Sequence, residues 1–332
     1  MSVKHSNISI FVPHIGCPNM CSFCNQRHIT GVSMAPHPED VEIAVQNAKK
    51  SKKYDPSTTE IAFFGGSFTA INRNYMLGLL KAAARFVESG DVSGIRISTR
   101  PDAIDGEVLN ILKEHHVTAI ELGAQALNDR VLRMNNRGHN TADVVKASAL
   151  IKEFGFELGL QLMTGLFADS DNSALRTAKR VIEIMPDTVR IYPTIVLKDT
   201  DLAALYSDGI YSPQTLEEAI SLAVKLYGMF TEAGIRVIRL GLHSIEENAY
   251  VAGPWHPAFS ELCQSRIMLN KVLKSLKEKG KYIIYVGKSD VSKMIGQKRS
   301  NLVHLSSLGY ECKVVERETL SNLDLRIEKE VV

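Results

Sequence analysis

Several features are scarce in this sequence of 332 residues, and each scarcity narrows the class of protein. No stretch offers the run of about 20 apolar residues that a membrane-spanning helix needs, so we expect no membrane partner. The N-terminal segment lacks the basic-then-apolar order of a secretion signal, because Pro13 and His14 interrupt it, and we expect a cytoplasmic protein. The five cysteines are too few, and odd in number, for a disulfide framework.

An excess of charge of one sign is also lacking, since the net charge is only +2. Its distribution is uneven. Residues 261–300 hold ten Lys and Arg against three acidic residues, a net charge of +7, while the rest of the chain carries −5. Such a basic segment is typical of a surface that faces nucleic acid, although a solvated lysine-rich helix remains the alternative.

Three of the five cysteines crowd into eight residues. Cys17, Cys21 and Cys24 have the spacing C-x3-C-x2-C and follow the first expected strand. In a reducing compartment such a group indicates a metal site, whereas Cys263 and Cys312 are expected to be buried thiols.

The cysteine group permits more than one kind of metal site. A [4Fe–4S] cluster normally takes four thiolates, so three would leave one iron open to an external ligand. A zinc ion held by the three cysteines and His28 is an alternative, as is a group of redox-active or buried thiols.

Short apolar runs alternate with helical patterns over roughly the first 240 residues. The expected strands are Ile8–Val12, Glu60–Phe64, Ile95–Thr99, Ala119–Leu122, Glu157–Leu162, Thr188–Ile191 and Arg236–Leu240. The expected helices include Tyr75–Glu88, Gly106–Glu114, Thr141–Phe154, Ser173–Met185 and Thr215–Ala233. This alternation predicts an α/β fold with a parallel sheet, and six or seven units favour a β/α barrel over a Rossmann sheet.

The pattern changes after about residue 255. We expect a helix, a strand, two short helices around a basic turn, and a further strand: Ala258–Glu278, Tyr282–Val286, Ser289–Ile295, Ser300–Leu308 and Tyr310–Glu316. This β-α-turn-α-β order is the minimal topology of a KH RNA-binding module. The expected domains are therefore residues 1–255, a β/α barrel, and residues 256–332, a helix plus a small α+β KH-like domain.

The basic turn resembles the GXXG turn with which KH modules clamp a nucleotide backbone. It has the sequence Gly296-Gln297-Lys298-Arg299, so arginine stands in place of the second glycine. Gly296, Lys298 and Arg299 are the residues we expect to contact RNA.

The cysteine segment, CPNMCSFC with Phe23, resembles the motif of the radical S-adenosylmethionine (SAM) superfamily. Gly65, Gly66 and Ser67, after the second strand, resemble the superfamily's second signature, in which a glycine pair lets the backbone approach SAM. The resemblance implies a partial (β/α)6-type barrel, in which Cys17, Cys21 and Cys24 hold a [4Fe–4S] cluster beside bound SAM.

More narrowly, residues 5–210 resemble the radical SAM domain of the Elongator catalytic subunit. The motifs that carry this resemblance are Ser98–Asp102, Glu121–Asp129, Asn136–His139, Met163–Leu166 and Ile191–Thr194. The resemblance implies that Gln125 and Arg137 bind SAM, and a guanidinium suits the SAM carboxylate. Thr99 and Gln161 are expected to face the ribose or the substrate. No residue is identified as catalytic.

The Elongator subunit carries an acetyltransferase domain after its barrel. The 77 residues from 256 to 332 are too few for that fold and contain no acetyl-CoA-type glycine loop, so acetyl transfer is not expected here.

The leading hypothesis is a radical SAM enzyme that cleaves SAM to a 5′-deoxyadenosyl radical and modifies RNA, either tRNA or rRNA. It would need an electron donor such as flavodoxin or ferredoxin. The alternatives are a radical SAM enzyme with a small-molecule substrate, and a non-catalytic RNA-binding protein with a structural metal site.

Overall fold

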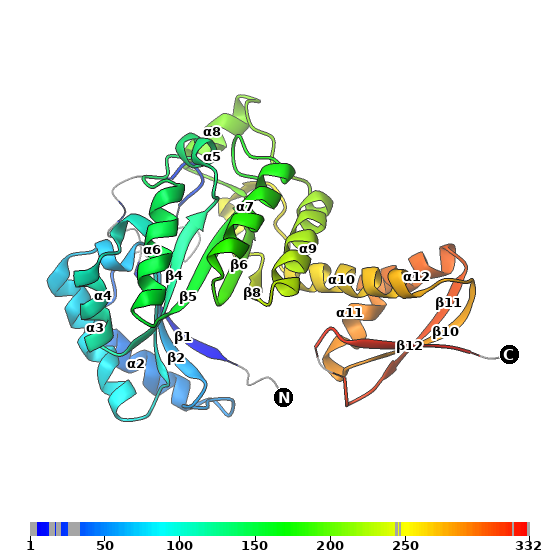
Figure 1. The fold of residues 1–332 in the computed structure, drawn as a ribbon, viewed down its shortest axis with the longest axis horizontal. Coiled ribbons are helices and arrows are strands. Elements are labelled where there is room, and N and C mark those ends of the chain that lie inside the picture. The colour runs from blue at the N-terminus through cyan, green and yellow to red at the C-terminus, as the bar shows by residue number, and fades with distance from the viewer. Residues whose placement is uncertain are drawn as a thin grey trace.

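The structure is a computed structural model that describes residues 5–12, 17, 21–25, 34–242, 245, 247–320 and 322–330. A parallel sheet of seven strands curves through the larger part of the molecule (Figure 1). The strands, in their order across the sheet, are β1 Ser6–Val12, β2 Thr59–Gly65, β3 Gly94–Thr99, β4 Val117–Gln125, β5 Glu157–Thr164, β6 Thr188–Pro193 and β8 Arg236–Leu240. Because β1 and β8 form its two edges, the sheet is an open barrel.

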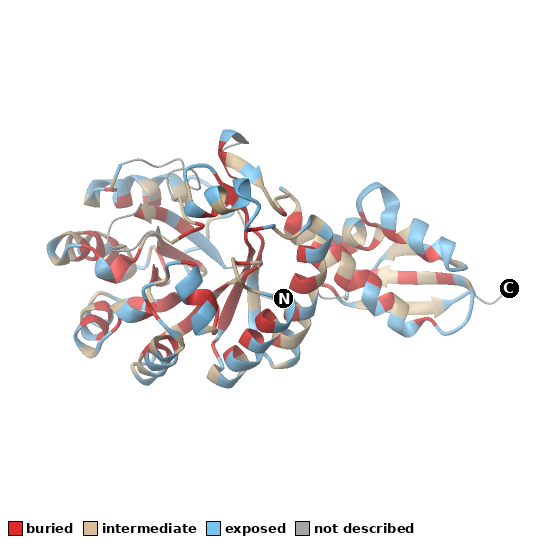
Figure 2. Ribbon diagram, turned by 90° about the horizontal axis from the view of Figure 1, so that it is seen from above, coloured by how far each residue is buried: buried red, intermediate tan, exposed pale blue. Residues whose placement is uncertain are grey.

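Helices connect the strands, and all but the two shortest, which lie at one end of the barrel, cover one face of this sheet (Figure 1). They are α2 Pro38–Lys49, α3 Arg73–Glu88, α4 Gly106–Glu114, α5 Asp129–Met134, α6 Thr141–Glu153, α7 Asp171–Ile184, α8 Asp201–Ser207 and α9 Leu216–Glu232. Figure 2 shows that the helices turn buried residues toward the sheet and exposed residues outward. Several helix starts are fixed by local capping. The Asn140 side chain accepts from the Asp143 backbone amide, and the Asp143 side chain bonds back to the Asn140 amide.

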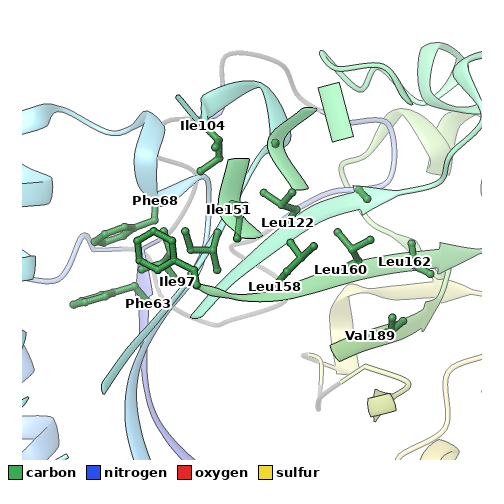
Figure 3. Packing of buried hydrophobic residues seen from close by; sticks show 14 of the residues in the cluster. Phe63, Phe68, Ile97, Ile104, Leu122, Ile151, Leu158, Leu160, Leu162 and Val189 are labelled. Carbon is green, nitrogen blue, oxygen red and sulfur yellow. The ribbon is translucent and has the colours of Figure 1, made fainter. Parts of the chain in front are cut away.

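The main core lies between the sheet and this helical layer (Figure 3). The rings of Phe63 and Phe68 stack with centroids 4.6 Å apart. Alternate residues of β5, namely Leu158, Leu160 and Leu162, point into the same core. The period-2 pattern of the strands therefore sends apolar side chains outward to the helices and leaves the other set for the inside of the barrel.

A smaller unit projects from the side of the barrel at α9 and α10 (Figure 1). Its elements are α10 Phe259–Ser275, β10 Gly280–Val286, α11 Val291–Ile295, α12 Ser300–Ser307, β11 Tyr310–Glu316 and β12 Leu325–Lys329. In its three-stranded sheet the central β10 pairs in parallel with β11 and antiparallel with β12. Met268, Val272 and Ile284 belong to a second apolar cluster inside this unit. A two-stranded ribbon joins β7 Val196–Leu197 to β9 Tyr250–Ala252.

The α/β fold, with its open parallel β/α barrel and a small C-terminal α+β unit, is confirmed. All seven expected barrel strands are present, and Gly106–Glu114 has the predicted bounds. The helix expected over Ala258–Glu278 ends at Ser275, because Leu276 is already extended. The division at residue 255 stays a prediction. Among the described residues no helix is long and apolar enough to cross a membrane.

Candidate active site

The site begins at the cysteine loop, directly after β1. Cys17, Cys21 and Cys24 are unpaired thiols, each half-buried. Burial and the neighbouring thiols raise the pKa of Cys24 to about 12, and they raise the pKa of Cys17 as well. Three thiolates could share this space only if positive charge balanced them, which is what iron ions supply when they bind sulfur.

The three-cysteine set fits an iron–sulfur cube. Within the part of the chain that the structure describes, no three potential ligands converge as they would on a single ion. Cysteine thiolates are the ligands that hold iron–sulfur cubes, one at each iron. His28, the fourth ligand of the zinc alternative, lies outside the described residues.

The turn after β2 brings backbone groups to the cysteine loop. Gly65 has a φ of +111°, and a Cβ at this position would lie 2.8 Å from the carbonyl oxygen of Val12. The Gly66 amide donates to this same oxygen at 2.8 Å. The next amide, that of Ser67, donates to the thiol of Cys17. Glycine at residue 65 therefore allows β1 and β2 to meet at the loop, and Ser67 contacts the first cysteine.

Thr99 joins the end of β3 to this turn. It is 3% exposed, and its hydroxyl lies 2.9 Å from that of Ser67 and 2.6 Å from that of Thr69. These bonds tie the ends of β2 and β3 together. Contact of Thr99 with SAM stays a prediction.

Gln125 and Arg137 meet near the end of β4. Arg137 donates from Nη2 to the Gly123 carbonyl at 2.6 Å and from Nη1 to Cys21 Sγ at 3.1 Å. The Arg137 Nε and Gln125 Oε1 atoms are buried and have no hydrogen-bond partner. Unpaired buried polar atoms are rare in folded proteins, so an unsatisfied donor and acceptor beside the cysteines fit a polar ligand such as SAM.

Two further side chains face this region, and we did not single them out from the sequence. His139 is 4% exposed, has a buried Nδ1 without a hydrogen-bond partner, and has a pKa lowered to about 4 by burial and by Arg137. Arg100 bonds to Asp102, and its pKa is raised in spite of burial by Asp102 and by the nearby thiols of Cys17 and Cys21. Arg100 lies in the Ser98–Asp102 motif and His139 in the Asn136–His139 motif. Their place in these motifs was the sequence feature that could have identified them.

Gln161 lies on the inner face of the sheet. Its Nε2 donates to Ser98 Oγ at 3.1 Å and to Glu121 Oε2 at 2.9 Å. Arg190 donates to both oxygens of Glu121, at 2.6 and 2.8 Å. Gln161 therefore belongs to a hydrogen-bonded group inside the barrel, and its contact with ribose or substrate stays a prediction.

The inner face carries a second ion pair next to Glu121. Arg96 donates to Glu60 at 2.8 Å and lies 3.5 Å from Glu121. All three side chains are at most 9% exposed. We did not predict this network, although charged residues inside otherwise apolar strands were its signal.

The predicted RNA-binding residues lie apart from the cysteines, in the projecting unit. Gly296 has a φ of +78°, and the turn continues with Lys298 at +51° and Arg299 at +62°. Gln297, Lys298 and Arg299 are exposed. Arg299 thus adopts the left-handed conformation for which a second glycine would be suited. Its contact with RNA stays a prediction.

Comparison with known proteins gives the class that this fold and loop define. Residues 11–181 match the radical SAM superfamily, and residues 186–268 match the radical SAM C-terminal domain. The chain belongs to the radical SAM superfamily. It is an enzyme whose cofactors are a [4Fe–4S] cluster and SAM.

Individual proteins and one solved structure are similar to this chain. The chain is 28% identical over 283 residues to an uncharacterized protein of Methanocaldococcus jannaschii, covering 83% of this chain and 81% of that protein. It is 25% identical over 239 residues to a tRNA uridine(34) acetyltransferase of Dehalococcoides mccartyi, covering 62% of this chain and 52% of that protein. The structure of the archaeal Methanocaldococcus infernus Elp3 shares the fold, with a TM-score of 0.66 at 21% identity, covering 83% of this chain and 65% of that one. The resemblance to the Elongator radical SAM domain is confirmed.

Proposed function

We propose that this protein is a radical SAM enzyme that modifies RNA, with tRNA as the first candidate. The proposal takes its substrate class from relatives such as the tRNA uridine(34) acetyltransferases, one of which this chain spans over 52% of its length. Two parts of the molecule support it separately. They are the site around the cysteine loop and the exposed turn of the projecting unit.

The residues around the cysteine loop suit SAM. When bound, the cluster and SAM supply a 5′-deoxyadenosyl radical that abstracts hydrogen. Cys17, Cys21 and Cys24 would hold the cluster. Arg137 has an Nε available for a carboxylate, and Gln125 has an Oε1 available for an amine. The buried pairs on the inner face of the sheet would exclude bulk water from the space where the radical acts.

The observation that carries the RNA assignment is the turn from Gly296 to Arg299. Two consecutive cationic residues in the left-handed conformation are uncommon, and here they present Lys298 and Arg299 to solvent. Asn301, which follows the turn, is 5% exposed. Its Nδ2 donates to the Lys293 and Met294 carbonyls at 3.2 and 3.1 Å, so hydrogen bonds connect the two helices that flank the turn. An exposed cationic turn is suited to phosphate groups.

Mass spectrometry of nucleosides tests the proposal. RNA from cells with the gene, without it, and with a Cys21→Ala copy would be digested and compared. We expect one modified nucleoside to be present only with the intact gene. A nucleoside profile that is the same in all three would contradict an RNA substrate and favour a small-molecule one.

A further inference from the structure

The short helix α5 packs against the cysteine loop. Its inner residues Val131 and Leu132 are 0% exposed and pack in one apolar cluster with Phe23, against which Cys21 and Cys24 also pack. The inner side of α5 and two of the cysteines thus contact the same apolar cluster.

Asn135, the residue after α5, connects the cysteine loop to this helix. Asn135 is 0% exposed, and its backbone carbonyl accepts from the Ser22 amide at 3.1 Å. Its side-chain oxygen accepts from the Ser22 hydroxyl at 3.0 Å. Because Ser22 adjoins Cys21, the position of α5 and the position of the cysteine loop are coupled.

The outer side of α5 is basic. Arg130 and Arg133 are exposed, and Met134 beside them is 43% exposed. Two exposed arginines of α7, Arg176 and Arg180, line a cavity of about 300 Å³ together with Arg130. We call Arg130, Arg133, Met134, Arg176 and Arg180 the arginine face.

One acidic residue lies within this face. Asp129 lines the same cavity, and its carboxylate accepts a hydrogen bond from the Thr141 amide at 2.8 Å. Hydrogen bonds from Thr141, with Arg133 and Arg180 nearby, lower the pKa of Asp129. The arginine face therefore keeps a net positive charge around a partly apolar centre.

We propose that the arginine face is the docking surface for an acidic one-electron carrier protein that reduces the cluster. In this step the carrier loses one electron and the cluster gains it, with no bond made or broken. Electron transfer slows steeply with distance, and α5 shares its apolar cluster with two of the cysteines. Complementary charge with a small apolar centre is typical of transient redox complexes, which are small and rapidly formed.

The alternative occupant of a basic surface is RNA. Arg176 and Arg180 of the arginine face lie on α7 in the outer helical layer, whereas Gln161 and Arg190 line the inner face of the sheet, where substrate would react. A carrier protein is therefore the better match. The inference rests on the cluster at Cys17, Cys21 and Cys24 and not on the identity of the substrate.

The test compares two reductants on the full-length protein with its reconstituted cluster. The variant is Arg130→Glu with Arg133→Glu, and the reductants are a reduced flavodoxin of net negative charge and dithionite. We expect the second-order rate of cluster reduction by flavodoxin, followed by absorbance, to fall at least about ten-fold at low salt and to depend less on salt. Reduction by dithionite should keep its rate. Binding of oxidised flavodoxin, measured by calorimetry, should weaken in parallel.

Lys81→Glu with Arg85→Glu is the matched control, since both residues are exposed and one turn apart on α3. The cluster of this control variant should be reduced at the wild-type rate by either reductant. Arg176→Glu, on the neighbouring helix, provides a second variant if the first folds poorly. An unchanged flavodoxin rate in both arginine-face variants would overturn the inference. If these variants lost RNA affinity while flavodoxin still reduced the cluster at the wild-type rate, the arginine face would be an RNA-binding surface. That result would also overturn the inference.

Discussion

Arg137 Nη1 lies 3.1 Å from Cys21 Sγ, while Nη2 of the same guanidinium donates to the Gly123 carbonyl at 2.6 Å. One cation thus connects the cysteine loop to the end of β4, and its buried Nε has no hydrogen-bond partner. A side chain in this position can hold an anionic ligand against the cluster without first having to be ordered.

Arg137→Ala should weaken SAM binding while the cluster is retained. A charge-assisted hydrogen bond to a buried ion contributes about 1.5–3 kcal/mol, so the SAM affinity should fall about ten- to one-hundred-fold. Anaerobic calorimetry would measure the affinity, and iron analysis the cluster. Lys179→Ala, an exposed cation on α7, is the matched control. Equal SAM affinity in Arg137→Ala and wild type would remove this residue from the site.

Gly65→Ala should destabilise the fold more than Gly90→Ala does. Both glycines have positive φ, which costs an alanine about 1–2 kcal/mol. At Gly65 the new Cβ would also lie 2.8 Å from the Val12 carbonyl oxygen, whereas at Gly90 it would meet nothing within 4 Å. Urea unfolding of the two variants measures the combined effect of this clash and of the larger φ at Gly65, +111° against +74° at Gly90. Equal losses in free energy of unfolding would mean that the approach of β1 to the turn is not tight.

Acid should weaken the fold through Glu60. Burial raises the pKa of this carboxyl, but His5, Arg96 and Thr118 outweigh burial and lower the pKa to about 2. A lowered folded-state pKa gives stability that is present above the unfolded value of about 4.3 and is lost as the pH falls to about 2. The loss is on the order of 3 kcal/mol.

Glu60→Gln should therefore flatten the dependence of the free energy of unfolding on pH within this window. Glu88→Gln, at a carboxylate that is 62% exposed, should leave the dependence unchanged. If the Glu60 variant and wild type lost stability in parallel on acidification, the proposed role of Glu60 would be wrong.

The turn from Gly296 to Arg299 should bind phosphate groups. Lys298→Asp with Arg299→Asp should reduce tRNA affinity, and each lost phosphate contact should remove about 0.7–0.9 from the log–log slope of binding against salt. Aspartate tolerates positive φ, so the turn should keep its conformation. Lys81→Asp with Arg85→Asp provides a control with the same change in charge. Filter binding across a salt series would measure the tRNA affinity and its slope against salt. An unchanged slope would mean that this turn does not contact phosphate and that the projecting unit has a structural role.

Periodicity was enough to predict the barrel, because each strand sends one set of apolar side chains to the helices. It was not enough for α2, whose buried residues are only Val41 and Val45. It also missed β12, a short edge strand of five residues. Charged residues such as Glu121 and Arg190 could not be paired from sequence, since their partners come from different strands. The cysteine spacing predicts a metal site from sequence alone, because the proposed ligands are adjacent in the chain.

Formation of 5′-deoxyadenosine tests the central claim most directly. The protein would be reconstituted without oxygen, given SAM and dithionite, and its products measured by liquid chromatography. We expect about four irons per chain and 5′-deoxyadenosine from the wild type and from Cys312→Ala, whose thiol lies on β11. The variant with Cys17→Ala, Cys21→Ala and Cys24→Ala should hold no cluster and form none of this product. Formation of 5′-deoxyadenosine by that triple variant would contradict the claim that these three cysteines hold the cluster that cleaves SAM.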